Sequence, residues 1–317
     1  MAPTPNFFIV GGPKCGTTAL YEYLRRHPDV FLPLNKEPQH FSTDLPLRHA
    51  VRDRGDYLHL FAGAGSARAI GDASTSHLQS REAAAGIARF APKARIVAIV
   101  REPISQVASM YNHWRGWGIE DIGDLEEAVW AGDRSGSKAA EAAGHPRLLD
   151  YREVARFGEQ LERYLEYFPP ERLRVLVFEE FVTDIPTAYQ GMLAFLGVDP
   201  SFRPAFERVN EGREARRPGI ARFLNAPPSP LRDAARRLVP LSLRHRIWHD
   251  GIRRVLHRAT TTTATPPRLS VEAEQRLRAE FRDDVSRLAV AIGRPDLPRI
   301  WGYEVAPVAP AGTPATR

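Results

Sequence analysis

Near its N-terminus the chain reads Phe7-Phe8-Ile9-Val10-Gly11-Gly12-Pro13-Lys14-Cys15-Gly16-Thr17-Thr18-Ala19-Leu20. The first four residues are an apolar run typical of a buried strand, and a loop punctuated by glycine and proline follows. From Thr17 onward apolar side chains recur at helical spacing until Pro28 stops the pattern, which indicates a helix. The stretch therefore predicts a strand, a glycine-rich loop and a helix in direct succession.

This loop has the features of an anion site. The start of a helix presents unpaired backbone N–H groups and the positive end of the helix dipole, and both favour a bound anion. Lys14 adds a positive charge, and Thr17 and Thr18 add hydroxyl donors. Gly11 and Gly16 keep the spacing of the nucleotide P-loop, but that motif has its lysine where Thr17 stands here. The loop therefore predicts an anion site that differs from a standard nucleotide P-loop.

Residues 13–20 resemble the 5′-phosphosulfate loop of the sulfotransferases that use 3′-phosphoadenosine 5′-phosphosulfate (PAPS). The resemblance implies a PAPS-dependent sulfotransferase of EC 2.8.2 type, which releases adenosine 3′,5′-bisphosphate and requires no metal. It further implies that the 5′-phosphosulfate is held by Lys14, Cys15, Gly16, Thr17 and Thr18. Lys14 would also stabilise the negative charge that grows on the leaving phosphate.

A second motif begins where the apolar run of residues 94–100 ends. Arg101 follows this run directly, and Ser109 stands eight residues later in an expected helix. Such a pair is common by chance, but after an apolar strand it resembles the family's 3′-phosphate signature, which implies that both residues bind that phosphate. Arg216 and Arg217 resemble the family's later basic loop, which closes over the same phosphate. A solvated charge run is an equally good interpretation of these two arginines.

The base that removes the acceptor's proton has two candidates in Lys36-Glu37-Pro38-Gln39-His40-Phe41. Pro38 favours an extended backbone at Glu37, which indicates a loop at a strand end. The stretch resembles the Lys-Glu-Pro-His-Phe-Phe motif of sulfotransferases that act on heparan-type sugars, in which the glutamate is the base. Here Gln39 stands in the histidine position and His40 follows it, so His40 competes with Glu37. The alternative for Glu37 is a surface ion pair with Lys36 or an arginine.

The acceptor is left open by the sequence. Residues 72–76 resemble an acid-x-Ser/Thr-Pro segment of the same subgroup, but they lack its lysine and proline. We therefore expect transfer to a hydroxyl or amine of a carbohydrate, a lipid or another small metabolite. Aromatic side chains at 111–117 are candidates for lining the acceptor cleft, although such residues more often belong to the core.

Alternating strand and helix patterns predict the fold class. Apolar runs predict buried strands at 94–100 and 173–179, and shorter extended segments are expected at 29–33 and 67–72. Helical patterns occupy residues 58–61, 80–90, 104–114, 151–168, 186–196 and 269–292. Strands that alternate with helices are typical of βαβ units. We predict an α/β, P-loop-like three-layer fold with a central parallel sheet flanked by helices.

The chain is expected to form one sulfotransferase domain over residues 1–303, with acceptor-side insertions near 115–147 and 220–268. Loops or linkers are expected at residues 132–137, 204–219 and 260–267, and a disordered tail at 304–317. No leader precedes the first strand, and no apolar run approaches ~18 residues. We therefore expect a cytoplasmic protein without a membrane span.

Composition narrows the function classes only partly. The net charge of +6 favours anionic ligands. Cys15 is the only cysteine, which excludes an intrachain disulfide and a multi-cysteine metal site. Two alternatives to a sulfotransferase stay open: a nucleotide-dependent phosphotransferase, and a non-enzymatic basic module that binds polyanions through the arginines of residues 213–258. Because those arginines are not interleaved with a nucleic-acid motif, we expect a small-molecule or carbohydrate partner and no nucleic acid. The oligomeric state is not indicated.

Overall fold

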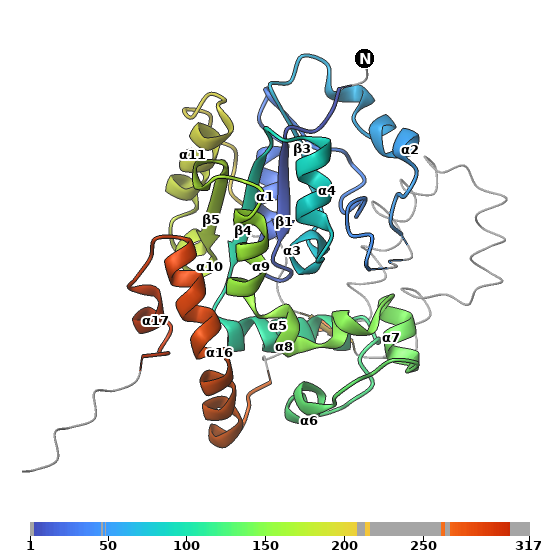
Figure 1. The fold of residues 1–317 in the computed structure, drawn as a ribbon, viewed down its shortest axis with the longest axis vertical. Helices are drawn as coiled ribbons and strands as arrows, with labels where there is room; N and C mark the ends of the chain where they lie inside the picture. The colour runs from blue at the N-terminus through green and yellow to red at the C-terminus, as the bar shows by residue number, and fades with distance from the viewer. Residues whose placement is uncertain are drawn as a thin grey trace, which may run out of the picture.

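A parallel sheet forms the centre of the molecule (Figure 1). The computed structural model describes residues 3–45, 47, 49–207, 213–215, 261–263 and 267–304. Within these ranges the main sheet has five strands in the order β2-β3-β1-β4-β5, all paired in parallel. The strands are β1 (Phe7–Gly11), β2 (Val30–Phe31), β3 (Ala69–Ala73), β4 (Arg95–Val100) and β5 (Leu173–Val177). Helices cover both faces of the sheet, so the predicted three-layer α/β architecture is confirmed.

The apolar runs form buried strands because both faces of the sheet are covered. All residues of β1 are buried, and so are those of β4 after its first residue. Phe7 of β1 pairs with Gly71 of β3, where a Cβ atom would lie 2.2 Å from the phenyl ring, so only glycine fits. The strand predicted to reach Glu179 ends at Val177, since acidic residues after Phe178 favour the first turn of a helix.

Most predicted helices are present, with shifted ends. The helices that surround the sheet and the site are α1 (Thr17–Leu24), α2 (Arg54–His59), α3 (Ser76–Gln79), α4 (Ala83–Phe90), α5 (Pro103–Gly116), α10 (Phe178–Thr183) and α11 (Ile185–Leu196). Short 3-10 helices occupy Ala62–Ala64, Pro146–Leu149 and Pro170–Arg172. Gly197 ends α11 in the left-handed conformation, as its position after the helical pattern predicts. None of the helices in the described ranges combines the length and the hydropathy needed to cross a membrane.

The helix predicted over residues 151–168 is divided into α8 (Tyr151–Val154) and α9 (Phe157–Leu165). The cause lies far along the chain, in α16 (Val271–Ala291), which packs along α9 (Figure 1). The carboxylate of Asp284 in α16 accepts hydrogen bonds of 2.9 Å from the backbone N–H groups of Gly158 and Glu159. These bonds satisfy the start of a second helix, so the pattern breaks there. The chain then reaches α17 (Leu297–Ile300).

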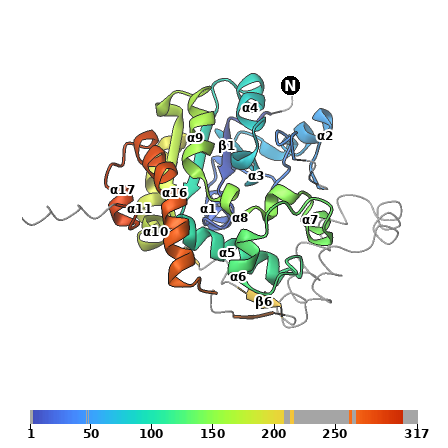
Figure 2. The ribbon, with the colours of Figure 1, turned by 60° about the horizontal axis from the view of Figure 1, so that its bottom comes forward.

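The predicted insertion at 115–147 is folded. It contains α6 (Leu125–Trp130) and α7 (Lys138–Ala143), which lie with α5 on the side that faces the viewer in Figure 2. Residues 132–137 form the expected loop, but it is anchored rather than free. Arg134 is only 8% exposed, and its guanidinium lies 2.6 Å from the carboxylate of Glu120 and 2.7 Å from that of Asp121.

A small antiparallel pair joins two segments that the sequence analysis assigned to a loop and a linker. β6 (Arg213–Ala215) pairs with β7 (Thr261–Thr263), and β6 lies against α5 (Figure 2). The run of threonines at 260–263 is therefore partly a strand, consistent with the β-preference of branched side chains. Most of the insertion predicted at 220–268 and the tail from residue 305 lie outside the described residues.

Candidate active site

The loop between β1 and α1 lies where ligands gather in open α/β sheets, at the carboxyl edge of the strands. The backbone N–H of Gly12 donates to the Ile99 carbonyl of β4 at 2.7 Å, which fixes the loop against the sheet. Gly16 adopts a left-handed conformation (φ 87°) at the start of α1, and no side chain caps this helix. The first backbone N–H groups of α1 are therefore free of a capping side chain at the position predicted for a bound anion.

Three cations meet beside this loop. Burial lowers the pKa of Lys14, and the positive charges of Lys36 and Arg101 lower it further. The guanidinium of Arg101 donates to the Lys14 carbonyl at 3.3 Å, while its buried Nε has no hydrogen-bond partner among the described residues. Buried N–H groups are normally paired. Converging cations and an unpaired N–H fit a bound anion.

The loop that follows β2 brings Glu37 to the same edge. Its backbone N–H donates to the carbonyl of Ala73, the last residue of β3, at 2.9 Å. Its carboxylate accepts hydrogen bonds of 3.1 Å from Lys36 on one oxygen and from Gln39 and Thr75 on the other. The carboxylate is thus held by donors from its own loop and from the segment that follows β3.

Lys36 connects this carboxylate to the start of α1. Its Nζ donates to the Thr18 hydroxyl of α1 at 2.9 Å and also lies 3.1 Å from the Glu37 carboxylate. The ion pair between Lys36 and Glu37, which the sequence offered as an alternative to a catalytic role, is present. It lies beside the start of α1, and the catalytic role of Glu37 stays a prediction.

His40 points into a different environment. Its Nδ1 lies 2.7 Å from the Val51 carbonyl, and its ring stacks on Tyr57 with a centroid distance of 4.2 Å. Burial lowers the pKa of this imidazole. The structure therefore places the two candidate bases differently. Glu37 contacts Lys36 and Thr75, whereas His40 lies in an aromatic cluster.

A buried carboxylate lies beneath the Glu37 loop. Asp72 of β3 is fully buried and accepts hydrogen bonds from the Tyr57 hydroxyl at 2.8 Å and the Ser74 hydroxyl at 2.7 Å. Burial raises the pKa of Asp72 to about 6, and the nearby charge of Glu37 acts in the same direction. The Ser74 oxygen in turn accepts from the backbone N–H of Gln39 at 3.0 Å. This network ties the loop to β3.

The predicted 3′-phosphate residues lie at the end of β4 and in α5. The guanidinium carbon of Arg101 lies 4.5 Å from the centre of the Phe178 ring, and Ser109 is half-buried in α5. The carboxylate of Glu102 caps α5, and the Tyr303 hydroxyl donates to it at 2.7 Å. The corner that carries Arg101 is therefore held from the C-terminal part of the chain.

The remaining predicted site residues lie either between β1 and the first turn of α1 or outside the described residues. Cys15 is fully buried, and burial raises the pKa of its thiol, as expected of a packing residue. Thr17 is buried and Thr18 half-buried at the start of α1. Arg216 and Arg217 lie outside the described residues. Of the aromatic candidates at 111–117, Tyr111 and Trp114 are buried in the core.

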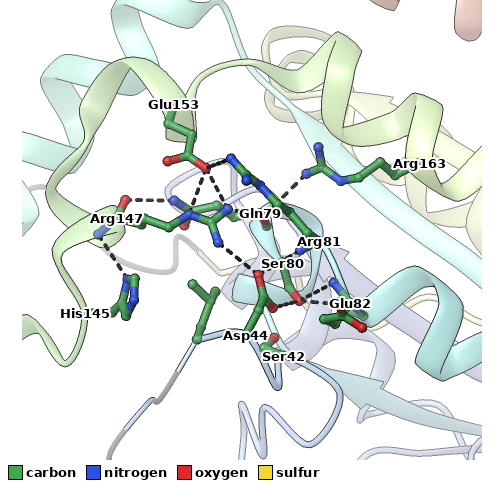
Figure 3. A network of polar contacts seen from close by, with 12 residues as sticks. Ser42, Asp44, Gln79, Ser80, Arg81, Glu82, His145, Arg147, Glu153 and Arg163 are labelled. Atoms are coloured by element: carbon green, nitrogen blue, oxygen red, sulfur yellow. Dashed lines mark hydrogen bonds and ion pairs between the residues drawn. The ribbon is translucent and has the colours of Figure 1, made fainter.

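A polar network ties the segment after the Glu37 loop to the insertion (Figure 3). The guanidinium of Arg147 lies 2.9 Å from the Asp44 carboxylate and 2.6 Å from that of Glu153 at α8. It also donates to the Gln79 carbonyl at 3.1 Å, and Asp44 accepts a hydrogen bond from Ser80. Arg147 therefore connects the segment after the Glu37 loop to the start of α8.

Sequence reasoning missed several residues of this site. The pair of Lys36 with Glu37 was among the alternatives, but the contact of Lys36 with the Thr18 hydroxyl was not predicted. Gln39 was treated only as a departure from the motif, and it donates to that carboxylate. Thr75 reaches Glu37 from 38 positions away, a contact that requires the order of the strands. Local sequence carries no sign of it.

Comparisons with known proteins identify the family. A family model described as the sulfotransferase domain matches residues 4–213. Human bifunctional heparan sulfate N-deacetylase/N-sulfotransferase 3 is 30% identical over 208 residues, which cover 62% of this chain and 23% of the relative. Human carbohydrate sulfotransferase 15 is 32% identical over 276 residues, which cover 68% of this chain and 48% of the relative. The chain thus spans about a quarter to about a half of the length of these curated relatives.

A solved structure is similar over nearly its whole length. The crystal structure of a sulfotransferase from Alicyclobacillus acidocaldarius has 27% sequence identity and a TM-score of 0.69, covering 95% of this chain and 99% of that chain. The fold, the loop at the carboxyl edge and the matched domain agree with the family predicted from the motifs. The chain belongs to the sulfotransferase domain family.

Proposed function

We propose that the protein is a PAPS-dependent sulfotransferase that transfers a sulfuryl group to a hydroxyl or amine. Membership of the sulfotransferase domain family supports the reaction class. The single observation that carries the proposal is the position of Lys36, whose Nζ contacts both Thr18 in the first turn of α1 and the neighbouring Glu37 in the loop after β2. Sulfuryl transfer requires an anion site and a proton acceptor side by side.

Each part of the donor has proposed ligands. Lys14, the backbone of Cys15 and Gly16, and the hydroxyls of Thr17 and Thr18 hold the 5′-phosphosulfate. Arg101 and Ser109 hold the 3′-phosphate. When bound, PAPS supplies an activated sulfuryl group. The unpaired Nε of Arg101 and the depressed pKa of Lys14 support an anion beside them, because an anion would offset the repulsion among the cations.

We propose Glu37 as the base. The acceptor's oxygen or nitrogen attacks sulfur in line with the bond to the bridging phosphate oxygen, which breaks, and adenosine 3′,5′-bisphosphate leaves. Glu37 takes the proton that the acceptor loses, and Lys14 stabilises the charge that develops on the bridging oxygen. Glu37 is favoured over His40 because its carboxylate contacts Lys36, whereas the His40 imidazole bonds the Val51 carbonyl.

A carbohydrate is the acceptor class we favour. The names of the two human relatives refer to heparan sulfate and to carbohydrate sulfation. Lipids and other small metabolites remain within the proposal, since the segment at 72–76 departs from the heparan-type motif. Transfer to oxygen or to nitrogen is decided by the acceptor.

The test begins with binding. Isothermal titration calorimetry of adenosine 3′,5′-bisphosphate against ATP with Mg²⁺ is expected to show binding of the bisphosphate. Binding of ATP with Mg²⁺ alone would instead identify a phosphotransferase, and tight DNA binding at physiological salt without bisphosphate binding would identify a polyanion-binding module. An acceptor panel with ³⁵S-labelled PAPS, including N-desulfated and O-desulfated heparan-type sugars, then identifies the acceptor.

A further inference from the structure

Arg52 donates hydrogen bonds to the backbone just after the proposed base, Glu37. This residue lies on the short segment before α2, and its side chain folds back onto residues 39–45. The guanidinium donates to four backbone carbonyls: Gln39 at 3.1 Å, His40 at 3.3 Å, Ser42 at 2.9 Å and Leu45 at 2.6 Å. Carbonyls gathered in this way need a planar, multidentate donor, which among side chains only arginine provides.

The loop that carries Glu37 has a backbone that requires outside support. Glu37 has φ 65°, so the extended backbone predicted there from Pro38 is wrong, and Gln39 has φ 54°. Both values lie in the left-handed region that non-glycine residues rarely adopt. Such conformations persist only where surrounding contacts over-determine them. The backbone N–H of Gln39 is held by the Ser74 hydroxyl and its carbonyl by Arg52. Both polar groups of the Gln39 backbone are thus fixed from outside the loop.

Gln39 links Arg52 to the Glu37 carboxylate. Gln39 donates through Nε2 to Oε2 of Glu37 at 3.1 Å. A second contact links the same two segments, because the Val51 N–H donates to the Pro38 carbonyl at 2.8 Å. The next residue after Arg52, Asp53, caps α2 by accepting a hydrogen bond from the Asp56 N–H at 2.9 Å.

We infer that Arg52 is a positioning residue for sulfuryl transfer, which orients the Glu37 carboxylate through Gln39 while touching neither donor nor acceptor. The inference rests on the proposed function, in which Glu37 is the base. Loss of the guanidinium releases the carbonyls of residues 39–45, so the carboxylate samples orientations that do not face the acceptor. The anion loop after β1 has its own contacts with β4 and is unaffected.

The experiment compares Arg52→Ala and Arg52→Lys with the matched control Arg54→Ala. Arg54 is a neighbouring exposed arginine whose guanidinium carbon lies 5.8 Å from the Phe90 ring. We expect kcat to fall about tenfold to a hundredfold in Arg52→Ala, the scale of a small misplacement of a reacting group. The Kd for adenosine 3′,5′-bisphosphate stays that of the wild type. Arg52→Lys also loses kcat, because an ammonium cannot bond the carbonyls in the planar fork. Arg54→Ala keeps wild-type kcat.

Rescue separates positioning from general loss of structure. Guanidinium chloride at low, non-denaturing millimolar concentrations is expected to restore kcat of Arg52→Ala saturably, while sodium chloride at equal ionic strength does not. The inference is overturned if Arg52→Ala keeps wild-type kcat, or if its kcat and bisphosphate affinity fall together and guanidinium restores neither. Should Arg52→Ala be too unstable to assay, full kcat in Arg52→Lys overturns the inference, and a loss of kcat at unchanged bisphosphate Kd supports it. A wild-type protein that binds no bisphosphate contradicts the proposed function instead.

Discussion

The Nζ of Lys36 lies 2.9 Å from the hydroxyl of Thr18. Lys36 belongs to the loop after β2, whereas Thr18 lies in the first turn of α1, which follows the loop after β1. β2 and β1 are separated in the sheet by β3, and both loops meet above its carboxyl edge. The same ammonium contacts Glu37 at 3.1 Å. The proposed base and the proposed donor site therefore share a cation, and substitutions on the two sides should have separable effects.

Replacing the proposed base should abolish most of the activity while nucleotide binding persists. Glu37→Gln keeps the shape of the side chain but cannot accept a proton, so we expect kcat to fall ~10²–10⁴-fold. His40→Asn should cost less, because the imidazole packs on Tyr57 away from Lys36. Steady-state kinetics and calorimetry with the bisphosphate measure both effects. An active Glu37→Gln beside a folded but inactive His40→Asn would reverse the assignment.

Lys14→Ala should lower turnover more than donor binding. We assign Lys14 to charge that grows on the bridging oxygen in the transition state, and such an interaction raises kcat rather than ground-state affinity. The measurement is kcat beside the Kd of adenosine 3′,5′-bisphosphate. Unchanged kcat in Lys14→Ala would rule out the leaving-group role.

Arg101→Ala should have the opposite profile. The 3′-phosphate keeps its charge throughout the reaction. Loss of the Arg101 guanidinium should therefore weaken nucleotide binding, with a smaller effect on kcat. The Kd ratio of adenosine 3′,5′-bisphosphate to adenosine 5′-monophosphate checks the contact directly, since only the first carries the 3′-phosphate. Arg68→Ala, an exposed arginine before β3, is the matched control. An unchanged ratio in Arg101→Ala would place the 3′-phosphate elsewhere.

Asp72→Asn should change the pH dependence of stability. The pKa of Asp72 is raised from 3.8 to about 6 by burial, so its ionisation disfavours the folded state. The stability that the protonated carboxyl contributes is complete below pH 3.8 and is lost as pH rises through about 6. Two pKa units correspond to about 3 kcal/mol, so the wild type should lose up to that amount relative to Asp72→Asn between pH 4 and pH 7.

Urea unfolding at both pH values measures this difference. Asp56→Asn is the control, because Asp56 is exposed and its substitution leaves the buried network intact. A difference between wild type and Asp72→Asn that stays constant with pH would mean that Asp72 titrates normally in the folded protein.

Sequence alone predicted the elements whose cause is local. The strand, glycine loop and helix of residues 7–20 and the transition at Arg101 follow from short patterns, and the structure has them where expected. The break before α9 was missed because the Asp284 carboxylate that causes it lies 126 positions from Gly158. Arg52 escaped notice for a similar reason, since its partners are backbone carbonyls, which any sequence offers. Contacts of this kind are set by topology.

The hydrogen bond from Tyr303 to Glu102 can form only late in synthesis of this chain. Its two residues are separated by 201 positions, and a ribosome that adds 5–20 residues per second delivers the tyrosine about 10–40 s after the glutamate. During biosynthesis, β4 and α5 therefore emerge long before the hydroxyl that holds the carboxylate between them. The corner that carries Arg101 is therefore completed only after β5, α9 and α16 have been made.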